Sequence, residues 1–307
     1  MTYDIIVIGG GPAGLTAALY ALRANKKVLV IEKSTFGGQI TFSPKVENIP
    51  GFLSLSGNEF AEKLVEQVLE QGAEVEYAEV LRIKDGGIKT VVTDSGEFKA
   101  PAVILATGAK HRLLGLDREE EFIGNGISFC AVCDGAFFKD GTVAVIGGGN
   151  SALQEALQLS DLAKKVYVIQ NLDFLTGEGR LAEAVGAKEN IEVMLGTTVQ
   201  GIKGDDTFRG VVLRREADGT LADLALDGMF VAIGLVPQNE AFENLIQLDA
   251  RGYAAYGEDC TTGTPGVFVA GDCRAKAIRQ VTTAAADGAV AALAACKYLE
   301  TFNAAKF

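Results

Sequence analysis

Two glycine-rich segments, one near the start of the chain and one near its middle, have the same surroundings. Residues 9–14 follow a short apolar run at 4–8, and residues 147–152 follow a similar run at 143–146. Each segment then opens a helical pattern of leucine and alanine. In a strand–turn–helix of this kind the first glycine makes the tight turn, the second lets the backbone approach a pyrophosphate, and the third lets the helix pack on the strand. The sequence therefore predicts an internal repeat of a Rossmann-like unit.

An acidic residue strengthens the interpretation of the first segment. The next apolar run, residues 27–31, ends in Glu32, roughly twenty residues beyond the glycines, where a carboxylate can accept hydrogen bonds from an adenosine ribose. A glycine pattern alone is a weak signal, but strand, helix and acid together favour a dinucleotide site over a plain turn.

Matching strand ends indicate how the two units are connected. Residues 102–106 lead into Thr107-Gly108, residues 229–233 lead into Gly234, and residues 266–270 lead into Gly271-Asp272 and an Ala-rich helix at about 281–301. The tail would thus complete the first unit. We expect an α/β fold of two Rossmann-like dinucleotide-binding domains with three-layer ββα architecture, the second inserted into the first. The expected domains are 1–111 with 239–307, and 112–238, with crossings at 111–115 and 236–239.

The layers between these strands are expected to be meanders. Strands at 75–83, 87–93 and 97–100 would form one, and residues 191–226 would form the second. A helix is predicted at about 57–71.

The segment Cys130-Ala131-Val132-Cys133-Asp134 places two cysteines two residues apart, directly before an acid. One thiolate at this spacing can attack a disulfide while its neighbour resolves the mixed intermediate, so the pair indicates a redox dithiol. A zinc half-site or two buried thiols are the alternatives. Zinc would need two further ligands, and the remaining candidates are scattered singly: His111, Cys260, Cys273 and Cys296. These three cysteines are expected to be small buried apolar residues.

Composition excludes several classes of function. The net charge is −12 with no basic stretch, which argues against nucleic acid as a partner. No apolar run reaches the length of a membrane-spanning helix. Residues 3–9 lead directly into a strand and a glycine-rich turn without a basic segment or cleavage site, so we expect that they are not a signal peptide. We therefore expect a cytoplasmic enzyme, a setting in which CxxC is catalytic more often than structural.

Taken together, these features resemble the low-molecular-weight thioredoxin reductase family of the flavoprotein pyridine nucleotide-disulfide oxidoreductases. The resemblance is co-linear over nearly the whole chain. It rests on residues 9–14, Gly38-Gln39, the 47–51 loop, residues 106–108, the cysteine pair with Asp134-Gly135, Gly271-Asp272 and Arg279-Gln280. It implies bound FAD, a homodimer, and reduction of the thioredoxin disulfide.

The resemblance also implies roles for individual residues. Gly9, Gly11 and Gly14 would hold the FAD pyrophosphate and Glu32 the adenosine ribose. Gln39 and Asn48 would lie near the flavin, Asp272 on the ribityl chain, and Gln280 at the edge of the ring. Further FAD contacts are implied for Pro12, Ala13, Lys33, Gly38, Thr107, Gly108, Gly271 and Arg279.

Within the cysteine pair, the resemblance implies that Cys133 faces the flavin and Cys130 attacks thioredoxin. Asp134 would protonate the leaving thiolate, a task suited to a carboxyl whose pKa is raised by partial burial. The alternative is that Asp134 caps a helix at 135–138, and both roles could coexist. The dithiol would meet its two partners in turn through a domain rotation about the crossings.

One site departs from the family pattern. NADPH-using members grip the ribose 2′-phosphate with a His-Arg-Arg run and a further arginine, because guanidinium groups offer paired donors at permanent charge. The matching positions here are Gln170, Asn171, Leu172 and Thr176, and the only acid nearby is Asp173. The chain therefore resembles the ferredoxin-dependent flavin thioredoxin reductases of anaerobes, which implies reduced ferredoxin as the donor.

Ferredoxins are usually acidic, as this chain is, so a local basic cluster would have to bind one. The candidates are Lys164, Lys165, Arg180 and Lys188, or Arg209, Arg214 and Arg215. NADPH or NADH acting through an altered ribose site is the alternative donor. A non-catalytic redox sensor and a ferredoxin–nucleotide reductase are the alternative functions; the latter normally lacks the cysteine pair.

Overall fold

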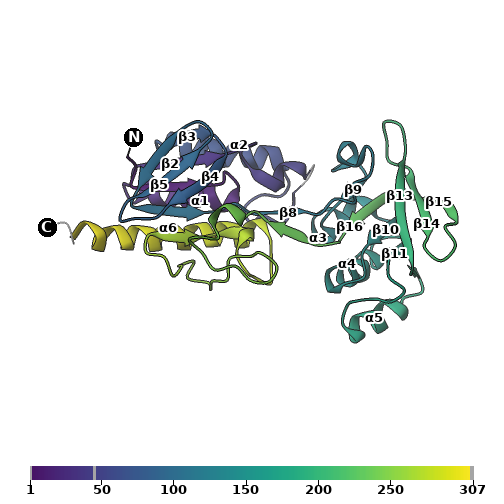
Figure 1. Ribbon diagram of the computed structural model, residues 1–307. Coiled ribbons are helices and arrows are strands. Elements are labelled where there is room, and N and C mark those ends of the chain that lie inside the picture. The colour runs from purple at the N-terminus through teal and green to yellow at the C-terminus, as the bar shows by residue number, and fades with distance from the viewer. Residues whose placement is uncertain (1, 44–45, 305–307) are drawn as a thin grey trace. The chain divides into compact units, whose positions relative to one another are not determined.

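The computed structural model describes residues 2–43 and 46–304. It consists of two compact units (Figure 1). Unit 1 comprises the chain up to Lys110 and from Val236 onward, and unit 2 is His111–Leu235. Among the described residues, no helix combines the length and the apolar character needed to cross a bilayer.

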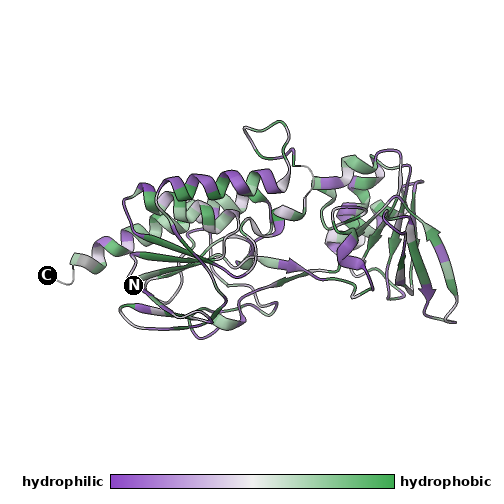
Figure 2. Ribbon diagram, turned by 90° about the horizontal axis from the view of Figure 1, so that it is seen from above, coloured by the Kyte–Doolittle hydropathy of each residue, from purple (hydrophilic) through white to green (hydrophobic). Residues whose placement is uncertain are grey.

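Unit 1 is built on a parallel five-stranded sheet. Its strands, in spatial order, are β18 (Val267–Val269), β7 (Ala102–Leu105), β1 (Ile5–Ile8), β2 (Val28–Glu32) and β3 (Glu74–Tyr77). The four strands other than β3 are buried on both faces, which explains why each is a continuous apolar run. Figure 2 shows central strands in the hydrophobic colour. Because β18 comes from the tail and pairs with β7, unit 2 is an insertion, and the expected α/β fold with one dinucleotide-binding unit inserted into the other is confirmed.

Two layers cover that sheet. On one face lie α1 (Pro12–Arg23), α2 (Gly57–Glu70) and the alanine-rich α6 (Val281–Ala304). Small residues let α1 and α6 approach closely: a Cβ on Gly288 would lie 2.1 Å from the carbonyl oxygen of Ala13. On the other face lies an antiparallel sheet of β4 (Val80–Lys84), β5 (Lys89–Thr93) and β6 (Glu97–Ala100).

Unit 2 has the same three layers as unit 1. Its parallel sheet has the order β12 (Ile191–Met194), β11 (Lys165–Ile169), β10 (Thr142–Ile146), β16 (Gly228–Val231) and β9 (Ile127–Ser128). One face is covered by α4 (Asn150–Ser160) and α5 (Gly179–Gly186). The other is covered by β13 (Thr197–Lys203), β14 (Gly210–Arg215) and β15 (Leu221–Ala225).

The prediction of a single strand over residues 75–83 was wrong. The segment contains β3, which pairs in parallel with β2, and β4, which pairs antiparallel with β5. The backbone N–H of Ala78 donates to the Glu32 carbonyl at the end of β3, and the chain then leaves the main sheet. The stretch 191–226 divides in the same way, because β12 belongs to the parallel sheet rather than to the meander. Alternating hydrophobicity shows that a segment is a strand, but not which sheet it joins.

The chain crosses between the units through two short strands that pair with each other, β8 (Ala109–His111) and β17 (Leu235–Pro237). The remaining short elements are η1 (Gly38–Phe42), η2 (Glu119–Phe122), α3 (Ala131–Asp134), η3 (Gly135–Phe138), η4 (Glu240–Phe242) and η5 (Gly271–Cys273).

Candidate active site

The glycines of the turn between β1 and α1 differ in the space around the position that a Cβ atom would occupy. A Cβ on Gly9 would lie 2.3 Å from the carbonyl oxygen of Ala106, and one on Gly14 would lie 1.9 Å from that of Gly9, so packing within the protein requires both. A Cβ on Gly11 would meet nothing closer than the Gly37 oxygen at 3.8 Å. The open space above Gly11 is what a closely approaching pyrophosphate needs.

Glu32 ends β2 with its carboxylate held beside this turn. The backbone N–H of Gly10 donates to one oxygen at 2.7 Å, and the N–H of Ser34 donates to the other at 2.8 Å. The Ser34 hydroxyl also donates, at 3.1 Å. A carboxylate has about four acceptor positions, so Glu32 can still accept from one ribose hydroxyl. Lys33, the next residue, instead extends toward Glu79, with 3.5 Å between its Nζ and a carboxylate oxygen.

Asp272 supplies the clearest indication of a ligand-binding position in unit 1. Its Oδ1 is buried and has no hydrogen-bond partner among the described residues. Burial raises the pKa of this carboxyl, while the charges of Lys276 and Arg279 lower it. The preceding Gly271 lies against α1, since its Cβ would be 2.7 Å from the Cβ of Ala13. A buried polar atom without a partner calls for one, and a ribityl hydroxyl fits that position.

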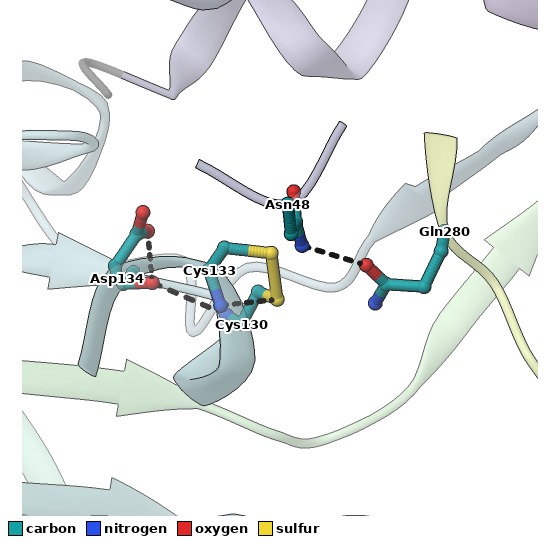
Figure 3. Close-up of a disulfide and its surroundings, with 6 residues drawn as sticks. Asn48, Cys130, Cys133, Asp134 and Gln280 are labelled. Atoms are coloured by element: carbon teal, nitrogen blue, oxygen red, sulfur yellow. Dashed lines mark hydrogen bonds between the residues drawn. A yellow bond between two sulfur atoms is a disulfide. The ribbon is translucent and has the colours of Figure 1, made fainter. Parts of the chain in front are cut away.

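Other residues predicted near FAD also make contacts within unit 1. The N–H of Gly37 donates to the Gly10 carbonyl at 2.8 Å, which brings Gly38 and Gln39 to the turn. The Asn48 Nδ2 donates to the Gln280 Oε1 at 3.2 Å (Figure 3).

Four more of these residues have a defined local setting. Arg279 lies over the ring of Tyr253, 4.1 Å from its centroid, and its Nε donates to the carbonyl of Asp272 at 3.4 Å. The Thr107 hydroxyl donates to Asn239 at 3.2 Å, and Gly108 has a φ of +68°. Pro12 occupies the start of α1. The residues present therefore fit FAD.

In unit 2, Cys130 and Cys133 form a disulfide with 5.3 Å between their Cα atoms. Cys130 caps the short helix α3, and the backbone N–H of Cys133 donates to the Cys130 Sγ at 3.2 Å (Figure 3). A hydrogen bond from an amide favours the thiolate form of the sulfur that receives it. Both cysteines are half-buried, whereas Val132 between them is 59% exposed. Among the described residues, the Cys130 sulfur is the one of the two for which an amide donor is found.

Asp134 is buried behind this pair. Its Oδ2 accepts a hydrogen bond of 2.6 Å from the hydroxyl of Ser128, and its Oδ1 has no partner among the described residues. Burial raises the pKa of Asp134, and the Ser128 bond lowers it. The alternative prediction holds in position only: Asp134 is the N-cap residue of η3, but its side chain makes no capping bond to that helix. The tertiary partner Ser128 binds the carboxylate instead.

The second glycine-rich turn keeps its shape. Gly147 has a φ of +129°, and its Cβ would lie 2.6 Å from the Ala232 oxygen. A Cβ on Gly149 would meet nothing closer than the Thr176 hydroxyl at 3.7 Å. Unit 2 therefore retains an open cradle like the one at Gly11.

At the ribose end of that turn, the described positions that match the family's arginines, Asn171, Leu172 and Thr176, carry no positive charge. Gln170 is buried against Gly148 and donates from Nε2 to the Phe174 carbonyl at 3.3 Å. Leu172 is 40% exposed. An uncharged amide and an exposed aliphatic chain cannot replace guanidinium groups as partners of a 2′-phosphate.

Several basic residues considered for ferredoxin binding are paired with acids of the same chain. The pairs are Lys165–Glu192 at 2.9 Å, Arg180–Glu178 at 2.8 Å, Lys188–Asp161 at 2.6 Å and Arg215–Asp218 at 3.6 Å. Lys164, Arg209 and Arg214 form no ion pair with the described part of the chain, and they are the cations best able to meet a partner.

Sequence analysis did not single out three residues near these sites. Ser128 binds Asp134. Glu155 lies beside the backbone amide of Ala131 in α3. Asp287 binds the backbone of Gly271. A lone acid within the apolar part of α6 was a usable signal for Asp287. No motif marks Ser128 or Glu155.

Two dinucleotide-binding folds, with a cysteine-pair disulfide and a buried acid on the second, define a disulfide oxidoreductase. The sequence pattern of the pyridine nucleotide-disulphide oxidoreductase family matches residues 3–288. The chain belongs to this family.

Similar proteins agree with this assignment. The chain is 43% identical to a thioredoxin reductase of Listeria monocytogenes, over 97% of this chain and 94% of that protein. It is 42% identical to one of Treponema pallidum, over 98% of each. The crystal structure of thioredoxin reductase from Streptococcus pyogenes matches with a TM-score of 0.93 and 39% identity, over 98% of this chain and 99% of that one. These similarities do not support the narrower resemblance to the ferredoxin-dependent branch.

Proposed function

We propose that the chain is an FAD-dependent thioredoxin reductase that reduces the thioredoxin disulfide through Cys130 and Cys133. The observation that carries this proposal is the half-buried disulfide with the buried acid Asp134 behind it. The open space at Gly11 and the unpartnered Oδ1 of Asp272 support FAD in unit 1. The names of the similar proteins support thioredoxin as the substrate.

When bound, FAD would supply the electron pair that converts the disulfide to two thiols. The thiolate of Cys130, favoured by the N–H of Cys133, attacks one sulfur of the thioredoxin disulfide. A mixed disulfide forms as the thioredoxin S–S bond breaks, and the departing thiolate takes a proton from Asp134. Cys133 then gives up its proton and attacks the Cys130 sulfur. The bond between Cys130 and thioredoxin breaks, the second thioredoxin sulfur leaves as a thiolate that takes up a proton, and the Cys130–Cys133 bond is restored.

The proposed electron donor is reduced ferredoxin. Support comes from the ribose end of the unit 2 turn, where Gln170, Leu172 and Thr176 offer no cation to a 2′-phosphate. One specific observation favours NADPH or NADH as a second candidate: the cradle at Gly149 is open.

A single substitution separates the two donors. Gly149→Ala fits the protein, since its new Cβ has 3.7 Å to its nearest neighbour, but it fills the space that a pyrophosphate would use. Turnover driven by ferredoxin should be unchanged in this variant. Turnover driven by NADPH or NADH should fall at least tenfold.

Anaerobic mixing provides the direct test. Reduced ferredoxin should bleach the flavin absorbance and sustain thioredoxin reduction, whereas NADPH at micromolar concentration should not. Prompt bleaching by NADPH, abolished by Gly149→Ala, would overturn the ferredoxin proposal and leave the reductase activity intact. A flavin that is reduced without any turnover of thioredoxin would instead indicate a redox sensor.

We also propose that the enzyme works in the cytoplasm as a homodimer, as the family resemblance implies. Sedimentation of the FAD-loaded protein at micromolar concentration should give twice the mass of one chain. A single-chain mass at that concentration would refute the dimer.

A further inference from the structure

One buried hydroxyl connects the acid of the proposed reaction with the backbone of the attacking cysteine. Ser128 is the last residue of β9, which pairs with β16 at the edge of the unit 2 sheet. Its side chain is 5% exposed. Its Oγ lies 2.6 Å from the Oδ2 of Asp134 and 3.1 Å from the backbone nitrogen of Cys130.

With Asp134 ionised, the direction of both hydrogen bonds follows from the atoms involved. The Cys130 N–H can only donate, so it uses one lone pair of the Ser128 oxygen. The single proton of the hydroxyl is then free to point at Asp134, and no other acceptor among the described residues contacts this hydroxyl. The Oδ2 of Asp134 is therefore an acceptor.

This direction decides where the transferable proton lies. As long as Oδ2 accepts the proton of Ser128, the proton that Asp134 takes up is carried on Oδ1. That oxygen is buried and has no partner among the described residues, so its proton is not held in another bond.

We propose that Ser128 is a positioning residue for proton transfer: it holds Asp134 and the Cys130 backbone on one rigid strand end and assigns the transferable proton to Oδ1. This inference rests on the proposed reductase function. The proton moves from Oδ1 to the departing sulfur, and Ser128 keeps its own proton throughout. Its bond to Oδ2 then stabilises the carboxylate that is left behind.

If Ser128 had only a structural role, replacing another buried serine of unit 2 should have the same effect on the reaction. Ser160 offers the comparison, because it is also buried in unit 2 and its hydroxyl donates to the Leu157 carbonyl at 2.6 Å. It contacts none of the redox residues through that hydroxyl. Ser160→Ala is therefore a matched control for the loss of a buried serine hydroxyl.

The experiment measures thioredoxin reduction as a function of pH in the FAD-loaded enzyme. The rate should fall on the alkaline side as Asp134 loses its proton. Glu155 is the other buried acid beside α3, and because every variant compared retains it, differences in midpoint report on Asp134. In Ser128→Ala the carboxylate of Asp134 loses a stabilising bond, so Asp134 becomes a weaker acid. The midpoint of this fall should move up by about one pH unit, and proton transfer at neutral pH should be about tenfold slower. Ser160→Ala should keep the wild-type midpoint.

Ser128→Thr and Ser128→Val form a second pair of nearly equal shape. The threonine variant should keep the wild-type midpoint, and the valine variant should behave like Ser128→Ala. Equal midpoints in these two variants, or a wild-type midpoint in Ser128→Ala, would overturn the inference.

Infrared spectroscopy gives a readout that does not require turnover. The carbonyl band of protonated Asp134, identified by its absence in Asp134→Asn, should titrate at higher pH in Ser128→Ala than in the wild type. An unchanged titration would refute the positioning role. If wild-type enzyme with reduced flavin fails to reduce thioredoxin, the proposed function is wrong. The infrared titration would still show whether Ser128 stabilises the carboxylate of Asp134.

Discussion

The carboxylate of Asp287, within helix α6, accepts a hydrogen bond from the backbone N–H of Gly271, with 3.0 Å between nitrogen and Oδ2. Arg274 and Lys276 bind the same carboxylate at 3.0 Å each. Burial acts to raise the pKa of Asp287, but these bonds and charges hold it below its usual value. The C-terminal helix thus fixes the loop that presents Asp272 to the proposed flavin.

Asp287→Ala should loosen that loop and leave the guanidinium of Arg274, which is 2% exposed, without its buried partner. Removing one member of a buried ion pair costs about 3–5 kcal/mol of stability. We expect a lower melting temperature and a weaker FAD affinity, measured by flavin fluorescence on dilution. Lys276→Met removes a cation but leaves the Gly271 bond, so it should retain FAD better. Equal FAD affinity in both variants would contradict this account.

The two glycines Gly11 and Gly14 should respond differently to the same substitution. In Gly14→Ala the new Cβ would lie 1.9 Å from the Gly9 oxygen, so the variant should fold poorly or not at all. In Gly11→Ala the nearest atom is 3.8 Å away, so the protein should fold. Its FAD affinity should fall at least tenfold, because the methyl group fills the pyrophosphate space. A yellow, fully loaded Gly11→Ala protein would show that the pyrophosphate binds elsewhere.

The repeated architecture could be predicted from the sequence because buried parallel strands are continuous apolar runs and the turns that follow them need glycine. Both signals are local, as at 5–8 and Gly9 or at 142–146 and Gly147. The strand at 75–83 was predicted incorrectly for the opposite reason. The partners of β3 and β4 are far away in sequence, and only those partners place the two strands in different sheets.

The part of the site chemistry that could be predicted was likewise the part carried by residues adjacent in sequence. Cys130, Cys133 and Asp134 are adjacent in sequence, so their spacing alone indicated a redox pair with an acid. The partner of that acid is a single hydroxyl on a two-residue strand, and no spacing rule marks it. A local capping rule suggested a wrong bond for Asp134, because such rules do not include tertiary partners.

Asp134→Asn should slow thioredoxin reduction while leaving formation of the dithiol intact. An amide cannot supply the proton that the departing thiolate needs, and a positioned acid contributes roughly 10²–10⁴-fold to such a step. Stopped-flow measurement of the reduced enzyme mixed with oxidised thioredoxin isolates this step. Asp140→Asn, an exposed aspartate in the same unit, is the control and should react at the wild-type rate. Equal rates in the two variants would exclude Asp134 as the acid.

Glu155 should make the stability of the protein depend on pH. Burial raises the pKa of its carboxyl to about 7, although the Ala131 amide lowers it, and its Oε2 has no partner among the described residues. Between the usual pKa near 4.5 and about 7, the folded state holds the proton more tightly than the unfolded state. This contribution to stability therefore falls as pH rises through that window, and it is lost above about pH 7.

Glu155→Gln removes that dependence, because glutamine stays neutral. At pH 8 the variant should be more stable than the wild type, by about 1–3 kcal/mol, and near pH 5 the two should be similar. Thermal melts of the FAD-loaded proteins at both pH values provide the measurement. Glu183→Gln makes the same change of charge at an exposed position of α5 and should alter neither melt. If Glu155→Gln and Glu183→Gln shift the melting temperature equally at pH 8, net charge rather than burial of Glu155 is the cause.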